Sequence, residues 1–383
     1  MSILDHDGPL HKEATAWRRH LHSIPELSFD VIETAAFVAD KLRDFGCDEV
    51  VTGIARTGVV GLIEGRVGGP TVGFRADMDA LPIQEQTGSP WASTTPGRMH
   101  ACGHDGHTAM LLGAAKYLAE TRNFPGRIAV IFQPAEEDGG GGNVMVQEGM
   151  MERFGISKVF GMHNAPGLPV SHFAMRPGPI MAETLEFAIT VTGRGGHAAR
   201  PNETIDPIII GSHIVSALQT IVSRSVNPMD SLVVSVTKFQ AGSAFNIIAD
   251  QAHLSGTIRS LRKEVTENAR QRIKTICEGQ AALLGGRAEV EFIPSYPVTF
   301  NHPAETRLAA AVATQVSGSA NVDTDVAPTM GGEDFSYMLE ARPGAYILIG
   351  NGDGPGLHNH GYEFNDEAIP YGISYWAYLA QAA

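Results

Sequence analysis

The segment PTVGFRAD (70–77) is a short apolar run that ends in an acidic residue. Three later runs share this character, and each leads into carboxylates or imidazoles: GRIAVIFQ (126–133), KVFGMH (158–163) and GAYILIG (344–350). Helix-like segments lie between them, and residues 30–45 and 105–120 show apolar side chains at helical spacing. The alternation predicts an α/β domain in which helices pack on a mixed sheet.

The pattern changes near residue 183. The segment TLEFAITVTG (184–193) alternates apolar and polar residues, as expected for a sheet that is buried on one face only. The predicted elements follow in the order strand, helix, strand, strand, helix, strand, at residues 184–193, 206–223, 232–239, 252–259, 264–284 and 287–292. This order is the split ferredoxin-like arrangement, so the sequence predicts an inserted α+β domain at residues 182–294.

The α/β pattern returns after the inserted segment. Residues 304–316 and 367–382 have helical character and flank the apolar run at 344–350. The larger domain is therefore predicted to be discontinuous, comprising residues 1–181 and 295–383. A chain of 383 residues is also long enough that two domains are expected on size alone.

The charge balance is acidic, since 28 Lys and Arg residues against 42 Asp and Glu residues give a formal net charge of −14. Such a chain lacks the positive surface that binds nucleic acids and anionic membranes, so neither partner is expected. No apolar run approaches the roughly 20 residues of a membrane-spanning helix. The start of the chain shows no signal-peptide pattern, and three Cys residues form no disulfide framework, which together predict a cytoplasmic protein.

Side chains that can bind metals follow the carboxyl ends of the predicted strands. They are Asp77 and Asp79 after the first run, Glu136 and Glu137 after the second, His163 at the end of the third, and His358 and His360 after the fourth. Ligands of open α/β sheets bind just beyond the carboxyl ends of the strands. Because packing alone does not explain this distribution, we expect these groups to meet at one rim of the sheet.

The densest group of such side chains lies in MHACGHDGH (99–107), where five ligand-type residues occupy eight positions. Cys102 and His104 form a Cys-x-His turn just before a predicted helix. Thiolate, imidazole and carboxylate together suit zinc and its first-row neighbours. A buried Cys or a helix-capping His would explain any one of them alone, but the whole cluster favours a metal site.

Glu136 and Glu137 are adjacent carboxylates that would repel each other unless a positive charge lay between them. A metal site could use one as a ligand and the other to take a proton from water, as is usual in metal-dependent hydrolysis. An exposed acidic loop is the simpler alternative. The glycines at 139–142 resemble a phosphate-binding loop, but the preceding acids and the lack of a following Lys disfavour an anion site.

Three polar residues of the inserted segment are less distinctive. His197 ends the sequence GRGGH (193–197), in which glycines would let it project from a turn, although a plain Gly turn with an exposed His explains the pattern equally well. Asn246 and Arg259 lie near predicted strand ends and carry no signal by themselves.

Taken together, these segments resemble the family of di-metal aminoacylases and carboxypeptidases, in particular its branch of hippurate hydrolases, N-acyl-amino-acid amidohydrolases and indole-acetyl–amino-acid hydrolases. The resemblance covers nearly the whole chain. It is carried by WRRHLHSIPELSFDVIETAAFVADKL (17–42), RADMDALP (75–82), MHACGHDGHTAMLLGAAKYL (99–118), FQPAEEDGGGG (132–142), GMHNAPGLPV (161–170), GRGGHAARP (193–201), GGEDFSYML (331–339) and LHNHGYEFNDEAIP (357–370).

The resemblance implies two divalent metal ions per subunit, Mn²⁺ or Zn²⁺ with Co²⁺ or Ni²⁺ as further candidates. The positions that match metal ligands of the family are Cys102, His104, Glu137, His163 and His358. Glu136 matches the base that activates the attacking water, and Asp79 matches an acid that orients the site. His197 matches a His that stabilises the oxyanion in the neighbouring subunit, while Arg259 and Asn246 match residues that hold the substrate carboxylate. The inserted domain would then be a lid through which a homodimer forms.

The function that this resemblance implies is hydrolysis of the amide bond of a small N-acyl amino acid. Three alternatives stay open: a dipeptidase or carboxypeptidase on the same scaffold, a non-catalytic metal- or peptide-binding protein, and a nucleotide-dependent α/β enzyme. The last lacks a G-x-G-x-x-G motif after its first strand.

Overall fold

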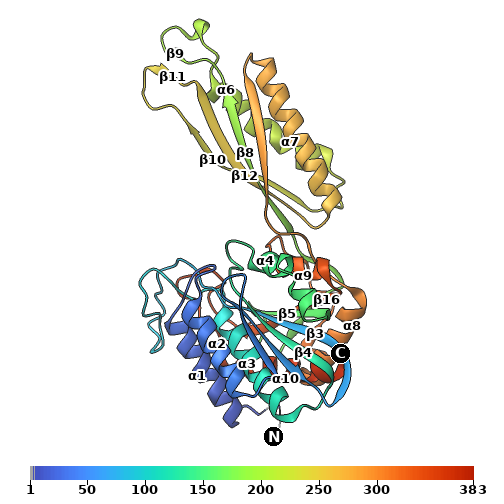
Figure 1. Ribbon diagram of the computed structural model, residues 1–383. Coiled ribbons are helices and arrows are strands. Elements are labelled where there is room, and N and C mark those ends of the chain that lie inside the picture. The colour runs from blue at the N-terminus through green and yellow to red at the C-terminus, as the bar shows by residue number, and fades with distance from the viewer. Residues whose placement is uncertain (1–2, 4) are drawn as a thin grey trace. The chain divides into compact units, whose positions relative to one another are not determined.

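The computed structural model describes residues 3 and 5–383 (Figure 1). The chain forms two compact units. The first runs to Ile180 and includes Thr299–Ala327 and Asp334–Ala383, and the second comprises Met181–Val298 and Pro328–Glu333. The main-chain N–H of Ala182 donates to the carbonyl of Gly331 at 2.9 Å, which ties the short segment 328–333 to the second unit.

The first unit is built on an eight-stranded sheet with the order β1-β2-β4-β3-β5-β16-β6-β15. Its strands are β1 (Glu49–Ile54), β2 (Gly58–Glu64), β3 (Val67–Asp77), β4 (Pro125–Gln133), β5 (Ile156–Pro166), β6 (Phe173–Ala174), β15 (Val322–Asp323) and β16 (Gly344–Gly352). The four central strands β4, β3, β5 and β16 are parallel, whereas β1 and β2 are antiparallel to their neighbours. The sheet is therefore mixed, as predicted.

The helices of the first unit are α1 (Pro9–Ser23), α2 (Ile32–Asp44), α3 (His104–Thr121), α4 (Gly141–Gln147), α5 (Met150–Arg153), α8 (Pro303–Ser317), α9 (Ser336–Ala341) and α10 (Ile369–Ala382). Helix α3 is buried along most of its length and packs against α1, α10 and β3. Gly113 permits this close approach, because a Cβ there would overlap Ile373 of α10. A short sheet of β7 (Gly178–Met181) and β14 (Thr299–Asn301) completes the regular structure, with 3-10 turns at Ser319–Asn321 and Asp366–Ala368.

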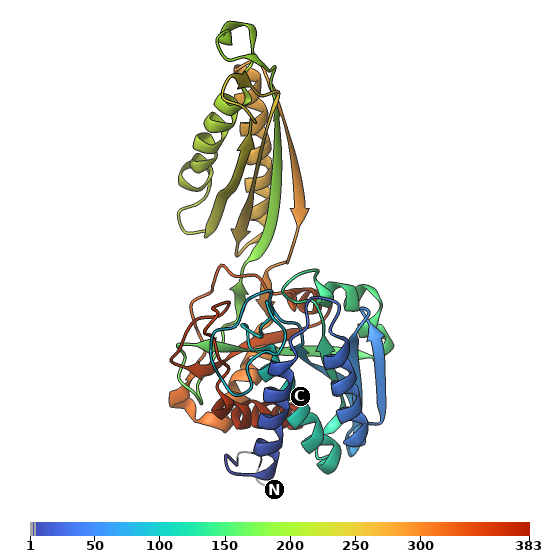
Figure 2. The ribbon, with the colours of Figure 1, turned by 90° about the vertical axis from the view of Figure 1, so that its left-hand side faces the viewer.

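The second unit is a four-stranded antiparallel sheet covered on one face by two helices (Figure 2). Its strands, in spatial order, are β10 (Leu232–Ala241), β12 (Gln251–Ser260), β8 (Glu183–Thr192) and β13 (Arg287–Pro294). The helices are α6 (Pro207–Thr220), continued by a π turn at Ile221–Ser225, and α7 (Lys263–Leu283). Alternate residues of β8 are buried in their shared core: Leu185, Phe187, Ile189 and Val191. This is the ferredoxin-like arrangement that the predicted order of strands and helices indicates.

A small ribbon lies in the long connections of the second unit. It pairs β9 (Gly196–His197) with β11 (Ile247–Ile248), next to a 3-10 turn at Pro201–Glu203. The ribbon brings His197 and Asn246 close together, although they are distant in sequence. His197 pairs with Ile247, and the N–H of the next residue, Ala198, donates to the carbonyl of Asn246 at 3.0 Å.

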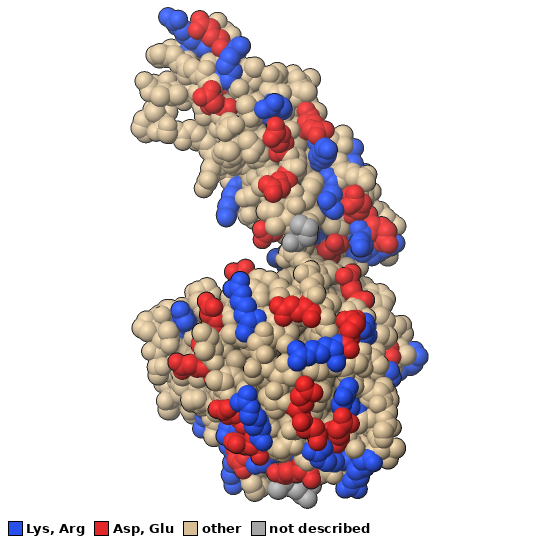
Figure 3. All heavy atoms as spheres, in the orientation of Figure 1, with Lys and Arg blue, Asp and Glu red and all other residues tan. Residues whose placement is uncertain are grey.

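Acidic and basic side chains are interspersed on the face shown in Figure 3. Helix α7 illustrates this mixture, since Arg270 pairs with Glu267 at 3.2 Å and Lys274 with Glu278 at 3.9 Å. Within residues 3 and 5–383, no helix has the length and apolar character needed to span a bilayer.

Candidate metal centre

The parallel register of β4, β3, β5 and β16 brings the predicted groups to one rim of the first unit. Asp79 lies just beyond β3, Glu136 and Glu137 lie beyond β4, His163 lies near the end of β5, and His358 lies in the loop after β16. Cys102 and His104 come from the turn that opens α3. The carboxyl ends of neighbouring parallel strands share an edge, which is why residues so far apart in sequence converge here.

The five predicted ligands converge on one small volume. Cys102 Sγ lies 3.4 Å from His163 Nε2, and His358 Nε2 lies 3.3 Å from Glu137 Oε1. One donor atom each from Cys102, Glu137 and His358 lie within 4.8 Å of one another, and the same is true of His104, Glu136 and Glu137. Two overlapping donor groups thus share Glu137.

The imidazole orientations fit cation binding. His163 donates through Nδ1 to the carbonyl of Asn164 at 2.7 Å, which leaves the Nε2 lone pair facing Cys102. His104 Nδ1 lies 3.4 Å from Asp79 Oδ1, and neither buried ring nitrogen makes a hydrogen bond to a described residue. Its Nε2 lies 3.7 Å from Asp77 Oδ2 and 3.9 Å from Glu137 Oε1, both beyond hydrogen-bonding distance, and a metal ion there would satisfy this buried nitrogen. The donor set therefore fits a metal site.

Asp79 holds the backbone of both adjacent carboxylates, Glu136 and Glu137, in place. Its Oδ1 accepts the main-chain N–H of Glu136 at 3.0 Å, and its Oδ2 accepts that of Glu137 at 3.1 Å. The residue before them, Ala135, has a left-handed backbone with φ of 57°, which is rare for an L-residue other than Asn or Asp. Such a conformation persists only where its surroundings fix it, and Asp79 supplies that constraint here.

The charges of the site also favour a cation. Burial opposes protonation of His104, but Asp77 and then Asp79 raise the pKa of its imidazole to about 10. Burial and the carboxylates of Glu137 and Glu136 raise the pKa of the Cys102 thiol. The surplus of carboxylates would be balanced by a divalent ion, which would replace these protons.

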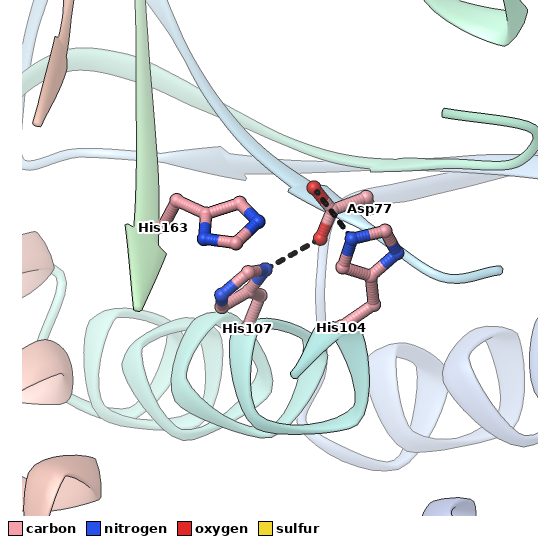
Figure 4. A group of neighbouring side chains, drawn as sticks. All are labelled: Asp77, His104, His107 and His163. Carbon is pink, nitrogen blue, oxygen red and sulfur yellow. Dashed lines mark hydrogen bonds and ion pairs between the residues drawn. The ribbon is translucent and has the colours of Figure 1, made fainter. Parts of the chain in front are cut away.

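Asp77 and His107 lie beside the ligands but serve another role (Figure 4). His107 Nδ1 donates to Asp77 Oδ1 at 2.6 Å, and its Nε2 accepts the N–H of Asn164 at 2.9 Å. The other oxygen of Asp77, Oδ2, accepts from Arg75 at 2.7 Å. Both ring nitrogens of His107 are engaged, so this residue has no nitrogen free for a metal, and Asp77 links it to Arg75.

A buried network fixes the start of α3. His22 of α1 donates through Nδ1 to Asp105 at 2.8 Å and lies 3.3 Å from Glu85 through Nε2. Burial opposes its charge, but Asp105 and Glu85 raise the pKa of His22 to about 9. The neighbouring His100 is also buried, and burial lowers its pKa to about 3. Asp105 and His100, which belong to the dense cluster of the sequence, are therefore interior groups.

The protonated His22 should make stability depend on pH. Its favourable interaction is fully present below pH 6.5, the ordinary pKa of His, and is lost as the pH rises through about 9. We expect the free energy of unfolding of the wild type to fall by up to about 3 kcal/mol over this window, relative to His22→Gln, which cannot titrate. Denaturant unfolding of both proteins from pH 6 to 10 measures the difference. A difference that is independent of pH would contradict the charged pair.

The remaining candidates lie in the second unit. His197 is exposed on β9, and its Nδ1 accepts the N–H of Ala199 at 3.1 Å, so its proton resides on Nε2. Arg259 lies on β12, where Nη1 donates to the carbonyl of Met330 at 2.9 Å. The structure thus gathers the predicted ligands, Glu136 and Asp79 in the first unit, and His197, Asn246 and Arg259 in the second.

Sequence reasoning missed a buried network beneath the rim. Arg75 donates to Gln133 through Nε and to Asp334 through Nη2, both at 2.9 Å, and Asp334 accepts the N–H of Gly142 at 2.7 Å. A signal was present, because Arg75 interrupts an apolar strand two residues before Asp77. A charge in that position is retained only when it is paired.

Parallel strands that deliver thiolate, imidazole and carboxylate donors beside a second carboxylate define a metal-dependent hydrolase. The family model of peptidase family M20/M25/M40 matches residues 73–382 of this chain. The chain belongs to this family.

Similar proteins align over nearly the full length. The chain is 42% identical over 378 residues to the hippurate hydrolase of Campylobacter jejuni, covering 99% of this chain and 97% of that protein. It is 39% identical over 375 residues to the N-acetylcysteine deacetylase of Bacillus subtilis, covering 98% and 97%. Among solved structures, the YXEP protein of Bacillus subtilis, described as a dinuclear metal binding peptidase, has a TM-score of 0.86 at 36% identity and covers 97% of both chains.

Proposed function

We propose that this protein is a metal-dependent amidohydrolase that cleaves the amide bond of N-acyl amino acids, with hippurate-like, N-acetyl or other acyl groups. The products are a carboxylic acid and a free amino acid. The observation that carries this proposal is the pair of carboxylates after β4, in which Glu137 faces His104 and His358 while Glu136 lies beside it. The hippurate hydrolase and deacetylase relatives support the substrate class.

Two divalent ions would be held by the ligand set Cys102, His104, Glu137, His163 and His358. The thiolate and imidazoles suit Zn²⁺, Co²⁺ or Ni²⁺, and the carboxylates also suit Mn²⁺. When bound, the ions would polarise the scissile carbonyl and lower the pKa of an attacking water. The dinuclear relative supports the number of ions.

The side chains divide the remaining chemistry. Glu136 takes the proton of the attacking water and passes it to the leaving amine, while Asp79 holds the Glu136 backbone in place. His197 presents an Nε2–H that can donate to the oxyanion, because its Nδ1 is occupied by Ala199. Arg259 and Asn246 bind the carboxylate of the substrate.

The second unit is proposed to act as the lid and as the surface of a homodimer. Apolar side chains are exposed on α6, where Ile208 and Ile209 have 41% and 51% of their surface accessible. Phe239 of β10 is 40% exposed and packs over Gly211 of the same helix. Such a patch is suited to pairing between copies. The free thiols Cys47, Cys102 and Cys277 agree with a reducing compartment, and we propose the cytoplasm.

A carboxypeptidase or dipeptidase activity is the second candidate. The observation that favours it is 42% identity over 348 residues to thermostable carboxypeptidase 2 of Saccharolobus solfataricus, covering 88% of this chain and 87% of that protein. The two activities differ in the acyl group that is removed: in a peptide it is an aminoacyl residue, free or N-blocked, whereas in an N-acyl amino acid it is a simple carboxylic acid.

Metal analysis combined with a substrate panel tests the proposal. Hippurate, N-acetylcysteine, N-acetyldiaminopimelate and indole-acetyl amino acids would be compared with free dipeptides and N-blocked peptides, by detecting the released amine. Chelator-sensitive release from the N-acyl amino acids is expected. Preference for peptides would favour the second candidate, and metal binding without any hydrolysis would indicate a binding protein.

The thiolate ligand gives a direct prediction. Cys102→Ala removes an anionic donor that binds the metal directly, so metal affinity should fall by more than the roughly 10- to 100-fold typical of losing an outer-shell partner, and activity should fall with it. Cys277→Ala is the matched control, because Cys277 is also buried but lies in α7 of the second unit. Both would be titrated with Zn²⁺ against a competing chelator. Full metal binding by Cys102→Ala would mean that Cys102 is a packing residue.

A further inference from the structure

Two residues outside the ligand set, Asn164 and Tyr362, pack closely against the turn that carries Cys102. Asn164 of β5 donates from Nδ2 to the carbonyl of Cys102 at 2.6 Å. Gly103 follows with φ of 91°, and a Cβ at this position would overlap Asn164 Nδ2 and lie 2.6 Å from Tyr362 Oη. Asn164 and Tyr362 therefore contact the turn so closely that only Gly fits between them.

Every polar atom of the Asn164 side chain has a partner. Besides the Cys102 carbonyl, Nδ2 lies 3.1 Å from His107 Nε2, and Oδ1 accepts from the Tyr362 hydroxyl at 2.7 Å. Only 1% of the residue is exposed. The amide can adopt one orientation alone, because turning it over would place Oδ1 against the carbonyl oxygen of Cys102.

Asn164 also connects the turn to a second ligand. It directly follows His163, and its main-chain carbonyl accepts from His163 Nδ1 at 2.7 Å, which directs His163 Nε2 toward Cys102. A third ligand joins the same turn, since the N–H of His358 donates to the carbonyl of Ala101 at 2.8 Å. Three ligands from three separate segments are thus joined through one turn.

We propose that Asn164 is a positioning residue that fixes the Cys102 thiolate relative to His163 and thereby sets the metal affinity of the site. This inference rests on the proposed metal centre. The inference requires a neutral amide at position 164, because this side chain must supply two hydrogen-bond donors and one acceptor. A carboxylate of the same size would face the Cys102 carbonyl and the lone pair of His107 with oxygen.

Asn164→Asp tests the inference, with Co²⁺ as the probe. Cobalt bound to a thiolate shows a charge-transfer band that reports the sulfur–metal bond directly. We expect the variant to bind Co²⁺ about 10- to 100-fold more weakly in competition with a chelator, and its band to be shifted or weakened. A purely structural role would leave this band unchanged.

Asn301→Asp is the matched control. Asn301 on β14 is fully buried, donates from Nδ2 to the carbonyls of Arg176 and Tyr346 at 3.0 and 2.8 Å, and accepts from the Tyr346 N–H at 2.6 Å. It should lose thermal stability as Asn164→Asp does, but keep the wild-type band and affinity, because its hydrogen bonds reach none of the ligands.

The outcomes distinguish a failure of the proposed metal site from a failure of the role of Asn164. A wild-type protein without the thiolate band would count against the proposed metal site itself. A wild-type band that persists unchanged in Asn164→Asp, with affinity within about twofold, would overturn the role of Asn164. If that variant does not fold, Tyr362→Phe decides, since it removes only the donor to Oδ1. A severalfold weaker affinity with a shifted band supports the inference, and wild-type values for both overturn it.

Discussion

Replacing Glu136 by Gln should lower kcat by on the order of 10² or more while leaving the metal content near that of the wild type. Gln keeps the size and much of the hydrogen bonding of Glu, but it cannot accept the proton of the attacking water. The backbone of residue 136 would stay in place, because Asp79 holds its main-chain N–H rather than its side chain. Steady-state kinetics and metal analysis on the same preparation measure both quantities.

Glu137→Gln is the matched control for this experiment. The two carboxylates are adjacent in sequence, but Glu137 Oε1 lies 3.3 Å from His358 Nε2 and 3.9 Å from His104 Nε2. Its loss should reduce metal affinity as well as the rate. If Glu136→Gln instead lost metal, or kept the wild-type rate with full metal, the assignment of base and ligand would be wrong.

The fold was predictable where one physical rule decides it. Apolar runs that end in acids or imidazoles indicated the parallel strands, and strict alternation at 184–193 indicated a sheet with one buried face. Helix α1 was not predicted, because its buried face mixes Arg18 and His22 with apolar residues and so blurs the apolar spacing. The assignment of residues 328–333 to the second unit has no local sequence pattern at all, because main-chain hydrogen bonds to distant segments decide it.

The sequence predicted which residues gather at the candidate site, but not how their side chains are oriented. The strand-end rule correctly brought Glu136, Glu137, His163 and His358 to one rim. Residue type alone could not separate His104 from His107, which lie one helical turn apart on α3. The separation depends on partners far away in the sequence, since Asp77 and Asn164 occupy both nitrogens of His107.

The same limit explains why the role of Asn164 could not be predicted from the sequence. Its neighbours in the chain suggest only the end of a strand. Its partners at Cys102, His107 and Tyr362 come from separate elements, and they meet only after the sheet has formed. Sequence patterns report which chemistry is present, whereas tertiary contacts decide which groups face a ligand.

His197→Ala should lower kcat by about 10²- to 10³-fold, as expected for the loss of an oxyanion donor. The Nδ1 of His197 is held by the Ala199 N–H, so the lost group would be the Nε2–H donor. His253→Ala, at an exposed His on β12 of the same unit, is the control and should keep wild-type activity. A His197→Ala enzyme with wild-type kcat would remove this residue from the chemistry.

Complementation then decides in which subunit His197 acts. Glu136→Gln and His197→Ala are each expected to be nearly inactive, and the two would be mixed under conditions that exchange subunits. If His197 serves the partner's site, each mixed dimer contains one site with an intact Glu136 and an intact incoming His197, so a fraction of the wild-type activity returns. If His197 serves its own subunit, every site still lacks one group and no activity returns. Subunit exchange would be verified with differently tagged chains. Exchange without recovery, or a fully active monomer, would contradict the action of His197 across a dimer while leaving the assignment of Glu136 intact.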